Sequence, residues 1–283
     1  MTKLNLNYIG WDTDRHLKTF DGWNKRCNLE FNYAYGSFSE QKYLLKAIKH
    51  IENPKIIDVG CATATTYRFL RNKLKNSAFS YKGIELSSPV IARARHLYRD
   101  IDILQTTGER PLAVLGSKVD IVYSRDTILH QEDPYDFLDQ LIEVTGKFLI
   151  IRLRTRDNGK TELDISKSSQ MHYDSFWMPY IVLNIDELIS YFKNKKNVTK
   201  VTINRSYEVL GGQNERLLPK DLYFKKAKGA ETSIMIELDY SKKEGVAEIV
   251  YDTSIQGRQF LIKNRWNFKF LIFKLISMLM NKK

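Results

Sequence analysis

The sequence predicts an α/β domain built on a mostly parallel sheet of seven strands with helices on both faces. Short apolar segments rich in β-branched residues alternate with segments of helical period, which is typical of parallel strands joined by crossover helices. The last two strand-like segments, 198–210 and 230–240, are separated by turn residues, which predicts an antiparallel hairpin at one edge. A length of 283 residues suits one such domain with appendages, or two small domains.

Each element follows from its local pattern. The predicted strands are 55–60, 80–86, 101–106, 119–124, 147–153, 198–210 and 230–240. The predicted helices are 65–74, 89–99, 134–144, 184–194 and one that begins near Ser39. Ser39 and Asn184 are candidate N-caps, and Pro89 suits a first helical turn. We expect a loop or mobile flap over 157–179 and a turn or long loop over 211–221.

Composition and charge limit the setting and the partners. Cys27 and Cys61 are the only cysteines, so we expect neither a disulfide framework nor a metal site. The N-terminal residues lack the pattern of a secretory signal, and we expect a cytoplasmic protein. The net charge of +12 favours anionic partners, although a basic proteome would produce the same excess. We divide the chain into an N-terminal cap (1–40), a core domain (41–240) and a C-terminal extension (241–283).

The first predicted strand ends in a turn of small residues. Asp58 lies at the end of the strand, Gly60 permits a tight turn, and Ala62 and Ala64 precede a helix. A strand, a small-residue turn and a helix start present backbone N–H groups to a ligand beyond the carboxyl ends of the strands. The sequence therefore predicts a nucleotide-type pocket here.

Two further acidic residues follow the next two strands. Glu85 ends the second strand, where a carboxylate accepts hydrogen bonds from both ribose hydroxyls of an adenosine group. Gly108 and Glu109 follow the third strand at the same edge, and Glu109 is placed to meet the adenine amino group.

This arrangement resembles the class I S-adenosylmethionine-dependent methyltransferases over about residues 40–240. The segment 58–61 matches their first motif, Glu85 their acidic second motif, and 108–109 resembles their third. Ser124-Arg125-Asp126, followed by His130, resembles the segment after strand four of the small-molecule members. The resemblance implies a Rossmann-like fold, S-adenosylmethionine as cofactor, and cofactor contacts by Asp58, Gly60, Cys61, Ala62, Glu85, Gly108, Glu109, Ser124 and Arg125.

One departure concerns the turn. The family usually has three glycines, and this chain has Gly60 followed by Ala62 and Ala64. Alanine resists positive φ, so cofactor affinity and catalysis are in question, although the turn stays small. The alternatives are a dinucleotide-binding oxidoreductase or a core turn without a ligand.

His130 is the first candidate for a catalytic base. Methyl transfer requires in-line approach of a nucleophile and, for a hydroxyl acceptor, a base. His130 lies just beyond the fourth strand, and an unperturbed pKa near ~6.5 suits this role. The alternative is a histidine that packs or caps the following helix. Asp126 is the second candidate, as a base or as a residue that orients the substrate.

Arg152, Arg154 and Arg156 alternate at the end of the fifth strand. Residues at i, i+2 and i+4 share one face of a strand, so three guanidiniums are predicted to bind an acceptor phosphate or carboxylate. The alternative is pairing with Asp157, Glu162 or Asp164.

Aromatic residues in the flap and the cap are candidates for acceptor contacts. They are His172, Tyr173 and Trp177 in the flap, and Tyr33 and Tyr35 in the cap. The alternative is that these residues pack the cap onto the core. Arg205 and Glu215–Arg216 are not placed by the sequence.

The C-terminal segment is apolar on most of its helical circumference. Of the 15 residues from Trp266 to Met280, 11 are apolar, which is short of the ~20 needed to span a bilayer. Polar residues gather on one narrow face and basic residues flank both ends, which favours a helix that lies in the surface of an anionic membrane. The alternative is a helix docked on the domain or across a homodimer contact.

The leading hypothesis is methyl transfer to a hydroxyl or amine of a small or lipid-linked acceptor, such as a surface-glycan sugar or phosphate, at the inner face of the membrane. A nucleic-acid methyltransferase is favoured by net charge alone, and the segment after strand four lacks the Asn/Asp-Pro-Pro-Tyr motif of that class. A non-catalytic scaffold that kept the fold is the third hypothesis.

Overall fold

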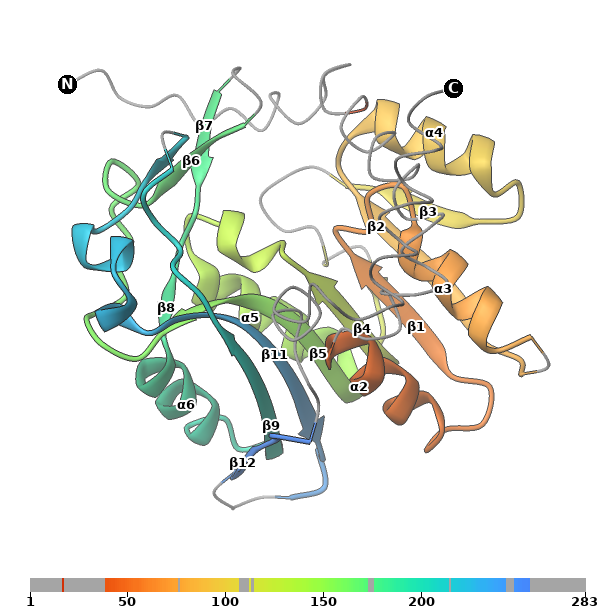
Figure 1. Ribbon diagram of the computed structural model, residues 1–283. Helices are drawn as coiled ribbons and strands as arrows, with labels where there is room; N and C mark the ends of the chain where they lie inside the picture. Colours follow the sequence, from red (N-terminus) through yellow and green to blue (C-terminus); the bar gives the residue numbers. More distant parts are fainter. Residues whose placement is uncertain are drawn as a thin grey trace, which may run out of the picture.

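The computed structural model describes most of the central part of the chain (Figure 1). The described residues are Leu17, 39–75, 77–106, 112, 115–172, 176–213, 215–242 and 247–254, with His172 and Phe176 described by their backbone alone. The predicted cap residues Tyr33 and Tyr35, the predicted cofactor contacts Gly108 and Glu109, the flap residue Tyr173 and the C-terminal helix all lie outside them.

A nine-stranded sheet in the order β12-β9-β11-β5-β4-β1-β2-β3, with β8 paired to β5, forms the centre of the fold. Its strands are β1 (Lys55–Val59), β2 (Ser80–Glu85), β3 (Asp102–Gln105), β4 (Val119–Arg125), β5 (Thr145–Arg156), β8 (Leu183–Asn184), β9 (Val198–Tyr207), β11 (Gly229–Leu238) and β12 (Glu248–Tyr251). The strands pair in parallel except for β11, which is antiparallel to both β5 and β9. The predicted α/β class, with a mostly parallel Rossmann-like sheet, is confirmed.

The sheet differs from the prediction in strand number. All seven predicted strands are present, and β8 and β12 extend the count to nine. The β9–β11 pair is the predicted antiparallel hairpin, but β11 inserts between β5 and β9, and β12 pairs with β9 as the outermost strand. The two extra strands span two and four residues, which is too short for a period of two to identify them.

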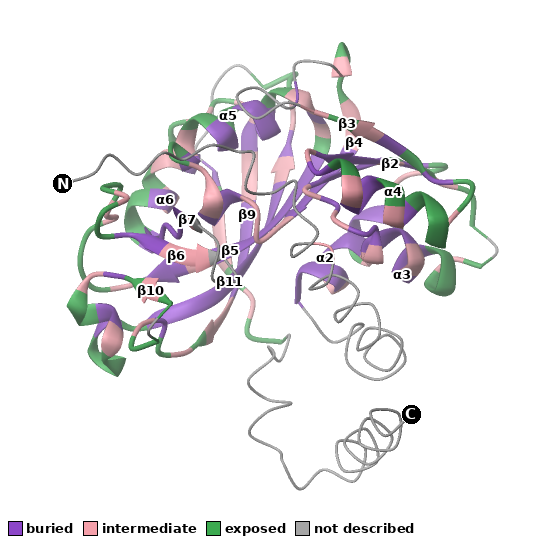
Figure 2. Ribbon diagram, turned by 90° about the horizontal axis from the view of Figure 1, so that it is seen from above, coloured by how far each residue is buried: buried purple, intermediate pink, exposed green. Residues whose placement is uncertain are grey.

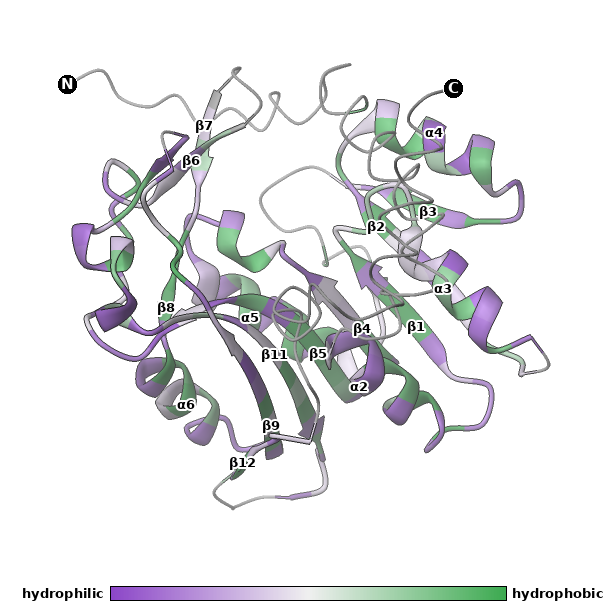
Figure 3. Cartoon of the chain, in the orientation of Figure 1, coloured by the Kyte–Doolittle hydropathy of each residue, from purple (hydrophilic) through white to green (hydrophobic). Residues whose placement is uncertain are grey.

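Helices cover both faces of the sheet. They are α2 (Ser39–Ile48), α3 (Thr65–Lys73), α4 (Ser88–Leu97), α5 (Pro134–Val144) and α6 (Ile185–Lys193). One apolar cluster packs α5 and α6 against Ile57 and Val122, and the other packs α2, α3 and α4 against Ile56 and Ile121. Neighbouring strand residues thus face opposite cores, as the side-chain period of a strand requires. The sheet is buried in Figure 2 and largely hydrophobic in Figure 3.

The structure confirms one of the two predicted N-caps. The Asn184 side chain accepts hydrogen bonds from Asp186 N at 2.9 Å and Glu187 N at 3.0 Å, as predicted for the start of α6. Pro89 lies in the first turn of α4, as predicted. Ser39 is itself helical, and its hydroxyl donates to Ser233 Oγ. The predicted domain boundary at residue 40 thus falls inside α2.

A small second sheet occupies the predicted flap. Strands β6 (Ser169–His172) and β7 (Phe176–Pro179) pair antiparallel, and β10 (Arg216–Leu217) joins β6 from the connection between β9 and β11. The prediction of loops over 157–179 and 211–221 was therefore wrong for these strands. These strands are at most four residues long, and β10 pairs with β6 from a distant segment.

Among the helices that the structure describes, none has both the length and the apolar character needed to cross a membrane.

Candidate functional site

The turn after β1 holds three residues in the left-handed region. Gly60, Ala62 and Ala64 have φ of 73°, 49° and 59°. The N–H groups of Gly60 and Cys61 donate to Ile84 O at 2.9 and 3.1 Å, so the turn is tied to the end of β2. Ala62 and Ala64 thus adopt the backbone that glycine adopts most easily, at a cost of roughly 1–2 kcal/mol each.

Of the three positions of the turn, Gly60 is the one whose surroundings leave no room for a side chain. A Cβ at this position would lie 2.2 Å from Thr127 Oγ1. Thr127 follows β4 and donates a hydrogen bond to Val59 O at 3.2 Å. The segment after β4 therefore lies directly against the turn after β1.

Glu85 holds the turn from the end of β2. Its Oε2 accepts a hydrogen bond from Ala62 N at 2.9 Å, and its Oε1 accepts from Leu86 N at 2.9 Å and Ser87 N at 3.2 Å. Burial raises the pKa of Glu85, although the three backbone N–H groups favour its ionised form. The carboxylate predicted to bind ribose hydroxyls thus also fixes the left-handed turn.

Asp58 lies beneath the turn rather than at its surface. The residue is 2% exposed, Tyr81 Oη donates to its Oδ2 at 2.7 Å, and burial raises its pKa to about 6. Cys61 is also buried, and burial raises the pKa of its thiol. Ser124 Oγ donates to Val59 O at 3.2 Å. The predicted cofactor contacts of these residues stay predictions, and any contact by Cys61 involves its backbone.

Arg152 and Arg154 form a network of ion pairs with carboxylates. Glu231 Oε1 lies 2.8 Å from Arg152 Nη2 and 3.0 Å from Arg154 Nη2. Asp126 Oδ1 lies 2.9 Å from Arg154 Nη1, and Asp126 Oδ2 lies 3.5 Å from Arg152 Nη1. Glu208 Oε1 lies 3.6 Å from Arg154 Nε. Both guanidiniums therefore already have carboxylate partners within the chain.

Glu40 of α2 is a further carboxylate in this network. Its Oε1 lies 3.4 Å from Arg125 Nε and 3.7 Å from Arg152 Nη1. Ser233 Oγ donates to Glu40 Oε2 at 3.0 Å. Since Glu40 is 1% exposed, its charge requires these cationic partners.

The structure corrects the expectation that three arginines form one anion-binding face. Arg156 is separate, because its guanidinium pairs with Asp221 and donates from Nε to Asn158 O. The alternative partners Asp157, Glu162 and Asp164 were also wrong for these arginines, and Asp157 pairs with Arg205. The free cationic face needed for an acceptor phosphate is absent from the described residues, because each guanidinium is neutralised.

Sequence reasoning missed Glu40, Glu208 and Glu231. A usable signal existed for Glu231, an acidic residue near the start of a largely buried strand. It lies opposite Arg154 in the β5–β11 register, so pairing the two strands correctly would place the opposite charges together. Glu40 and Glu208 reach the network only through tertiary packing.

His130 lies in the short 3₁₀ helix Ile128–His130 after β4. Its Nδ1 is 2.8 Å from Pro179 O, and since a carbonyl only accepts, Nδ1 carries the proton. Burial lowers the pKa of His130 to about 4. The imidazole is therefore neutral at pH 7 and a weak proton acceptor. Its predicted role as a base stays a prediction with less support.

Asp126 has a strained backbone and strong cationic neighbours. Its φ is 56°, and its N–H donates to Arg152 O at 2.9 Å. Burial would raise the pKa of Asp126, but the guanidiniums of Arg152, Arg154 and Arg125 outweigh it and hold this pKa well below the usual range. The carboxylate therefore stays ionised, which favours an orienting role over the role of a base.

The described flap residues His172 and Trp177 belong to the small sheet. His172 pairs with Phe176 and Met171 with Trp177 across the β6–β7 hairpin. Tyr180, just after β7, lies 6.1 Å from His130 between ring centroids. The guanidinium of Arg216 lies 4.5 Å from the centre of the Tyr180 ring. The small sheet therefore lies next to His130, and its side chains are candidates for acceptor contacts.

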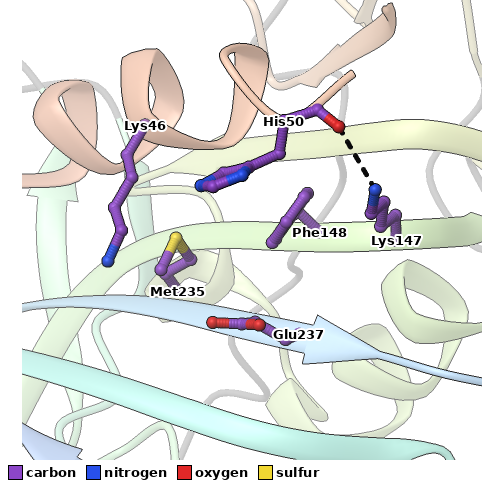
Figure 4. A pocket seen from close by; sticks show the side chains of 6 residues that line it. All are labelled: Lys46, His50, Lys147, Phe148, Met235 and Glu237. Carbon is purple, nitrogen blue, oxygen red and sulfur yellow. Dashed lines mark hydrogen bonds between the residues drawn. The ribbon is translucent and has the colours of Figure 1, made fainter.

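A cavity of about 260 Å³ lies at the opposite edge of the sheet (Figure 4). It is lined by Lys46, His50, Lys147, Phe148, Met235 and Glu237. These residues come from the end of α2, the start of β5 and the end of β11. The cavity is therefore separate from the turn after β1, which lies at the carboxyl ends of the parallel strands.

We predict that Ala62→Gly stabilises the protein by about 0.5–1 kcal/mol. The substitution relieves a left-handed alanine, and the greater freedom of glycine in the unfolded chain offsets part of the gain. Chemical denaturation of both proteins measures the difference. Gly60→Ala is the matched opposite, because its methyl group meets Thr127, and we expect a loss of stability. A loss in Ala62→Gly equal to that in Gly60→Ala would contradict the strain argument.

We predict that His130→Gln reduces the loss of stability on acidification. The folded-state pKa of about 4 lies below the unfolded value of ~6.5, so this histidine's contribution is complete above pH ~6.5 and is lost as the pH falls toward 4. Between pH 7 and 5 we expect the wild type to lose roughly 2–4 °C more in Tm than the variant. The contribution of Asp58 to stability depends on pH in the opposite sense, but it is the same in both proteins and cancels in the comparison. The control is His50→Gln, an exposed histidine, and equal losses in all three proteins would contradict the prediction.

Comparison with known proteins identifies the region that contains the turn. Residues 57–147 match the family model described as a methyltransferase domain. A comparison with curated proteins finds no match. The matched segment runs from β1 to the start of β5 and includes the left-handed turn, Glu85, Asp126 and His130.

Solved structures show a distant likeness. The N-terminal domain of EvdMO1 with SAH bound is 13% identical, with 70% of this chain and 79% of that chain covered and a TM-score of 0.49. A putative sarcosine dimethylglycine methyltransferase from Galdieria sulphuraria is 11% identical, with 70% and 83% covered and a TM-score of 0.49. An S-adenosylmethionine-dependent methyltransferase from Clostridium acetobutylicum is 12% identical, with 77% and 99% covered and a TM-score of 0.44.

The assignment depends on the family match and on the strand order, not on these distant structures. The order β3-β2-β1-β4-β5-β11-β9, with β11 antiparallel, agrees with the expectation from the resemblance. Residues 57–147 of this chain therefore match a methyltransferase domain, within a sheet of the expected mostly parallel, Rossmann-like kind.

Proposed function

We propose that the chain transfers a methyl group from S-adenosylmethionine to a hydroxyl or amine of a small acceptor, at the sheet edge where β1, β2 and β4 end. The observation that carries the proposal is the left-handed turn of Gly60, Ala62 and Ala64, fixed by Glu85. An unused core turn has no need of three strained or special backbone positions. The turn also argues against a scaffold that lost its ligand, because the alanines preserve the required backbone.

The residues around the turn fit the cofactor. A carboxylate has about four acceptor positions, and three backbone N–H groups among the described residues occupy three of those of Glu85. One acceptor position therefore remains for a ribose hydroxyl. When bound, the cofactor supplies an electrophilic methyl group on a sulfonium. The chain mainly has to position the acceptor and exclude water.

The acceptor side of the site is formed by the residues after β4. Thr127 lies against Gly60, so its neighbour Asp126 lies close to the turn. Nε2 of His130 is unprotonated, since Nδ1 donates to Pro179 O. These two side chains can accept a hydrogen bond from the attacking hydroxyl or amine and so orient it. The phosphate-bearing acceptor expected from the arginines loses its support, because Arg152, Arg154 and Arg156 pair within the chain.

Calorimetric titration with S-adenosylhomocysteine tests cofactor binding. We expect saturable binding by the wild type and at least tenfold weaker binding by Glu85→Gln, since a charge-assisted hydrogen bond to the ribose is lost. The matched control is Glu237→Gln, which removes a carboxylate at the opposite edge of the sheet, and we expect it to bind like the wild type. Absence of binding at millimolar ligand by a folded wild-type protein would contradict the proposal.

We further propose that the C-terminal extension attaches the enzyme to an anionic membrane surface. The support is the sequence of residues 255–283, which combines an apolar circumference with flanking lysines and arginine. This segment lies outside the described residues.

Cosedimentation with vesicles tests the attachment. We expect the full chain to bind phosphatidylglycerol vesicles and to bind phosphatidylcholine vesicles weakly, because each basic residue near an anionic surface adds about 1 kcal/mol. A chain ending at Ser254 should lose vesicle binding and keep its affinity for S-adenosylhomocysteine. Equal vesicle binding by the shortened chain would exclude a membrane role for the segment, and loss of cofactor binding would favour a helix docked on the domain.

A further inference from the structure

The ion-pair network at the cofactor edge contains more carboxylates than guanidiniums. Its members are Arg125, Arg152, Arg154, Glu40, Asp126, Glu208 and Glu231. The formal charges are three positive and four negative, so the network carries one net negative charge among the described residues. A basic chain of net charge +12 thus presents a locally acidic group beside its predicted cofactor site.

The topology of the sheet brings these carboxylates to one edge. Asp126 follows the carboxyl end of β4, and Glu208 follows that of β9, which runs parallel to β5 in the sheet. Glu231 lies near the start of β11, and because β11 is antiparallel, its start lies at this same edge. Arg154 contacts all three carboxylates, so they surround one guanidinium rather than spreading along the sheet.

Two carboxylates, those of Asp126 and Glu208, are the most accessible members of the network. The side chains of Asp126 and Glu208 are each 33% exposed, and those of Arg152 and Arg154 are 3% and 12% exposed. The most exposed charged groups among the described members of the network are therefore carboxylates. An anionic acceptor would be repelled, and a cationic or hydrogen-donating group would be attracted.

We propose that the methyl acceptor is an amine that binds beside Asp126 and Glu208, with Arg154 as the positioning residue that holds both carboxylates. The proposal rests on the methyltransferase function proposed above and specifies its substrate class. It replaces the anionic acceptor that the arginines suggested in the sequence.

The charge balance of the reaction supports an amine. The lone pair of a neutral amine nitrogen attacks the methyl carbon, the N–C bond forms, and the S–C bond breaks with its electron pair left on sulfur. The products are S-adenosylhomocysteine and a methylated ammonium ion, so the positive charge moves from sulfur to nitrogen. Carboxylates fixed beside the nitrogen stabilise the charge that develops there in the transition state.

An amine also agrees with the weakness of the available bases. A hydroxyl acceptor has to lose its proton, and the side chains nearest to the end of β4 are poor proton acceptors at neutral pH. The guanidiniums of Arg152 and Arg154 hold the pKa of Asp126 well below its usual range against the effect of burial, and burial lowers the pKa of His130 to about 4. An alkyl amine is mostly an ammonium ion at neutral pH, so it first releases one proton to water. The neutral amine then attacks without a base, and its positive charge remains on the methylated product.

Binding of sinefungin, which carries a primary amine in place of the methyl group, tests the charge preference directly. Calorimetry on the full chain measures the ratio of its Kd to that of S-adenosylhomocysteine. We expect the wild type to prefer sinefungin, and Glu208→Gln and Asp126→Asn to reduce this preference about tenfold while binding S-adenosylhomocysteine as before. Glu237→Gln is the matched control at the opposite end of β11, and its preference should not change.

The two proposals fail in different ways. If S-adenosylhomocysteine does not bind, the methyltransferase proposal fails. If it binds but sinefungin shows no preference, or the preference survives in both carboxylate variants, the amine proposal alone is overturned. Since Asp126→Asn removes a partner of Arg154 and can impair folding, Glu208→Gln is the decisive variant when only one of them folds.

The reaction itself separates an amine from a hydroxyl. The full chain is incubated with S-adenosylmethionine carrying a deuterated methyl group and a small-molecule extract of the producing cells, untreated or amine-blocked with an N-acetylating ester. We expect a deuterated product that disappears when amines are blocked. A product that persists in the blocked extract and carries the deuterated methyl group on oxygen, as located by tandem mass spectrometry, overturns the proposal.

Discussion

The burial of positive charge at the end of β5 constrains much of the surrounding structure. Arg152 and Arg154 lie on a central strand, where isolated guanidiniums are too costly to desolvate. Their carboxylate partners come from α2, from β11 and from the segments after β4 and β9. Opposite charges thus help to hold α2, β11 and the segments after β4 and β9 in place around β5. The same network places Asp126 beside the turn after β1, so the ion pairs that stabilise the fold also arrange the acceptor side.

The turn after β1 shows how a backbone can be preserved while its sequence departs from the family pattern. Three positions require left-handed φ, and two are occupied by alanine. Hydrogen bonds from the turn to Ile84 O and to the Glu85 carboxylate offset the strain. The absolute requirement for glycine is confined to Gly60, because Thr127 fills the space where its side chain would be. The substitution of alanine at the other two positions therefore affects strain and does not remove the pocket.

Periodic patterns predicted the fold well because burial on both faces of a sheet leaves a recognisable pattern among neighbouring residues. The alternation of Ile56 and Ile57 between the two cores, the Asn184 cap and the position of Pro89 each depend on neighbouring residues. The small sheet could not be predicted in this way, since its strands are at most four residues long and β10 pairs with β6 from a distant segment.

The same limit explains the outcome for the site. The turn residues and Glu85 belong to contiguous motifs, so their positions were predictable. The partners of the arginines were not, because Glu40 and Glu231 are separated from Arg152 by long stretches of chain. Three arginines at alternate positions indicated a cationic face in isolation. Only the tertiary structure shows that acidic neighbours neutralise it and leave carboxylates as the exposed groups.

The net charge of the chain thus favours an anionic partner, and the local charge at the end of β4 favours a cationic one. Which charge matters depends on its distance from the partner. At physiological ionic strength, exposed charges separated by more than about 8 Å are largely screened. The excess of +12 therefore acts on extended partners that contact many side chains at once, such as an anionic membrane surface. The proposed acceptor at the end of β4 would instead lie beside Asp126 and Glu208, which are within ion-pair distance of Arg154. In these two proposals, the exterior of a basic protein binds an anionic surface while its active site selects an amine.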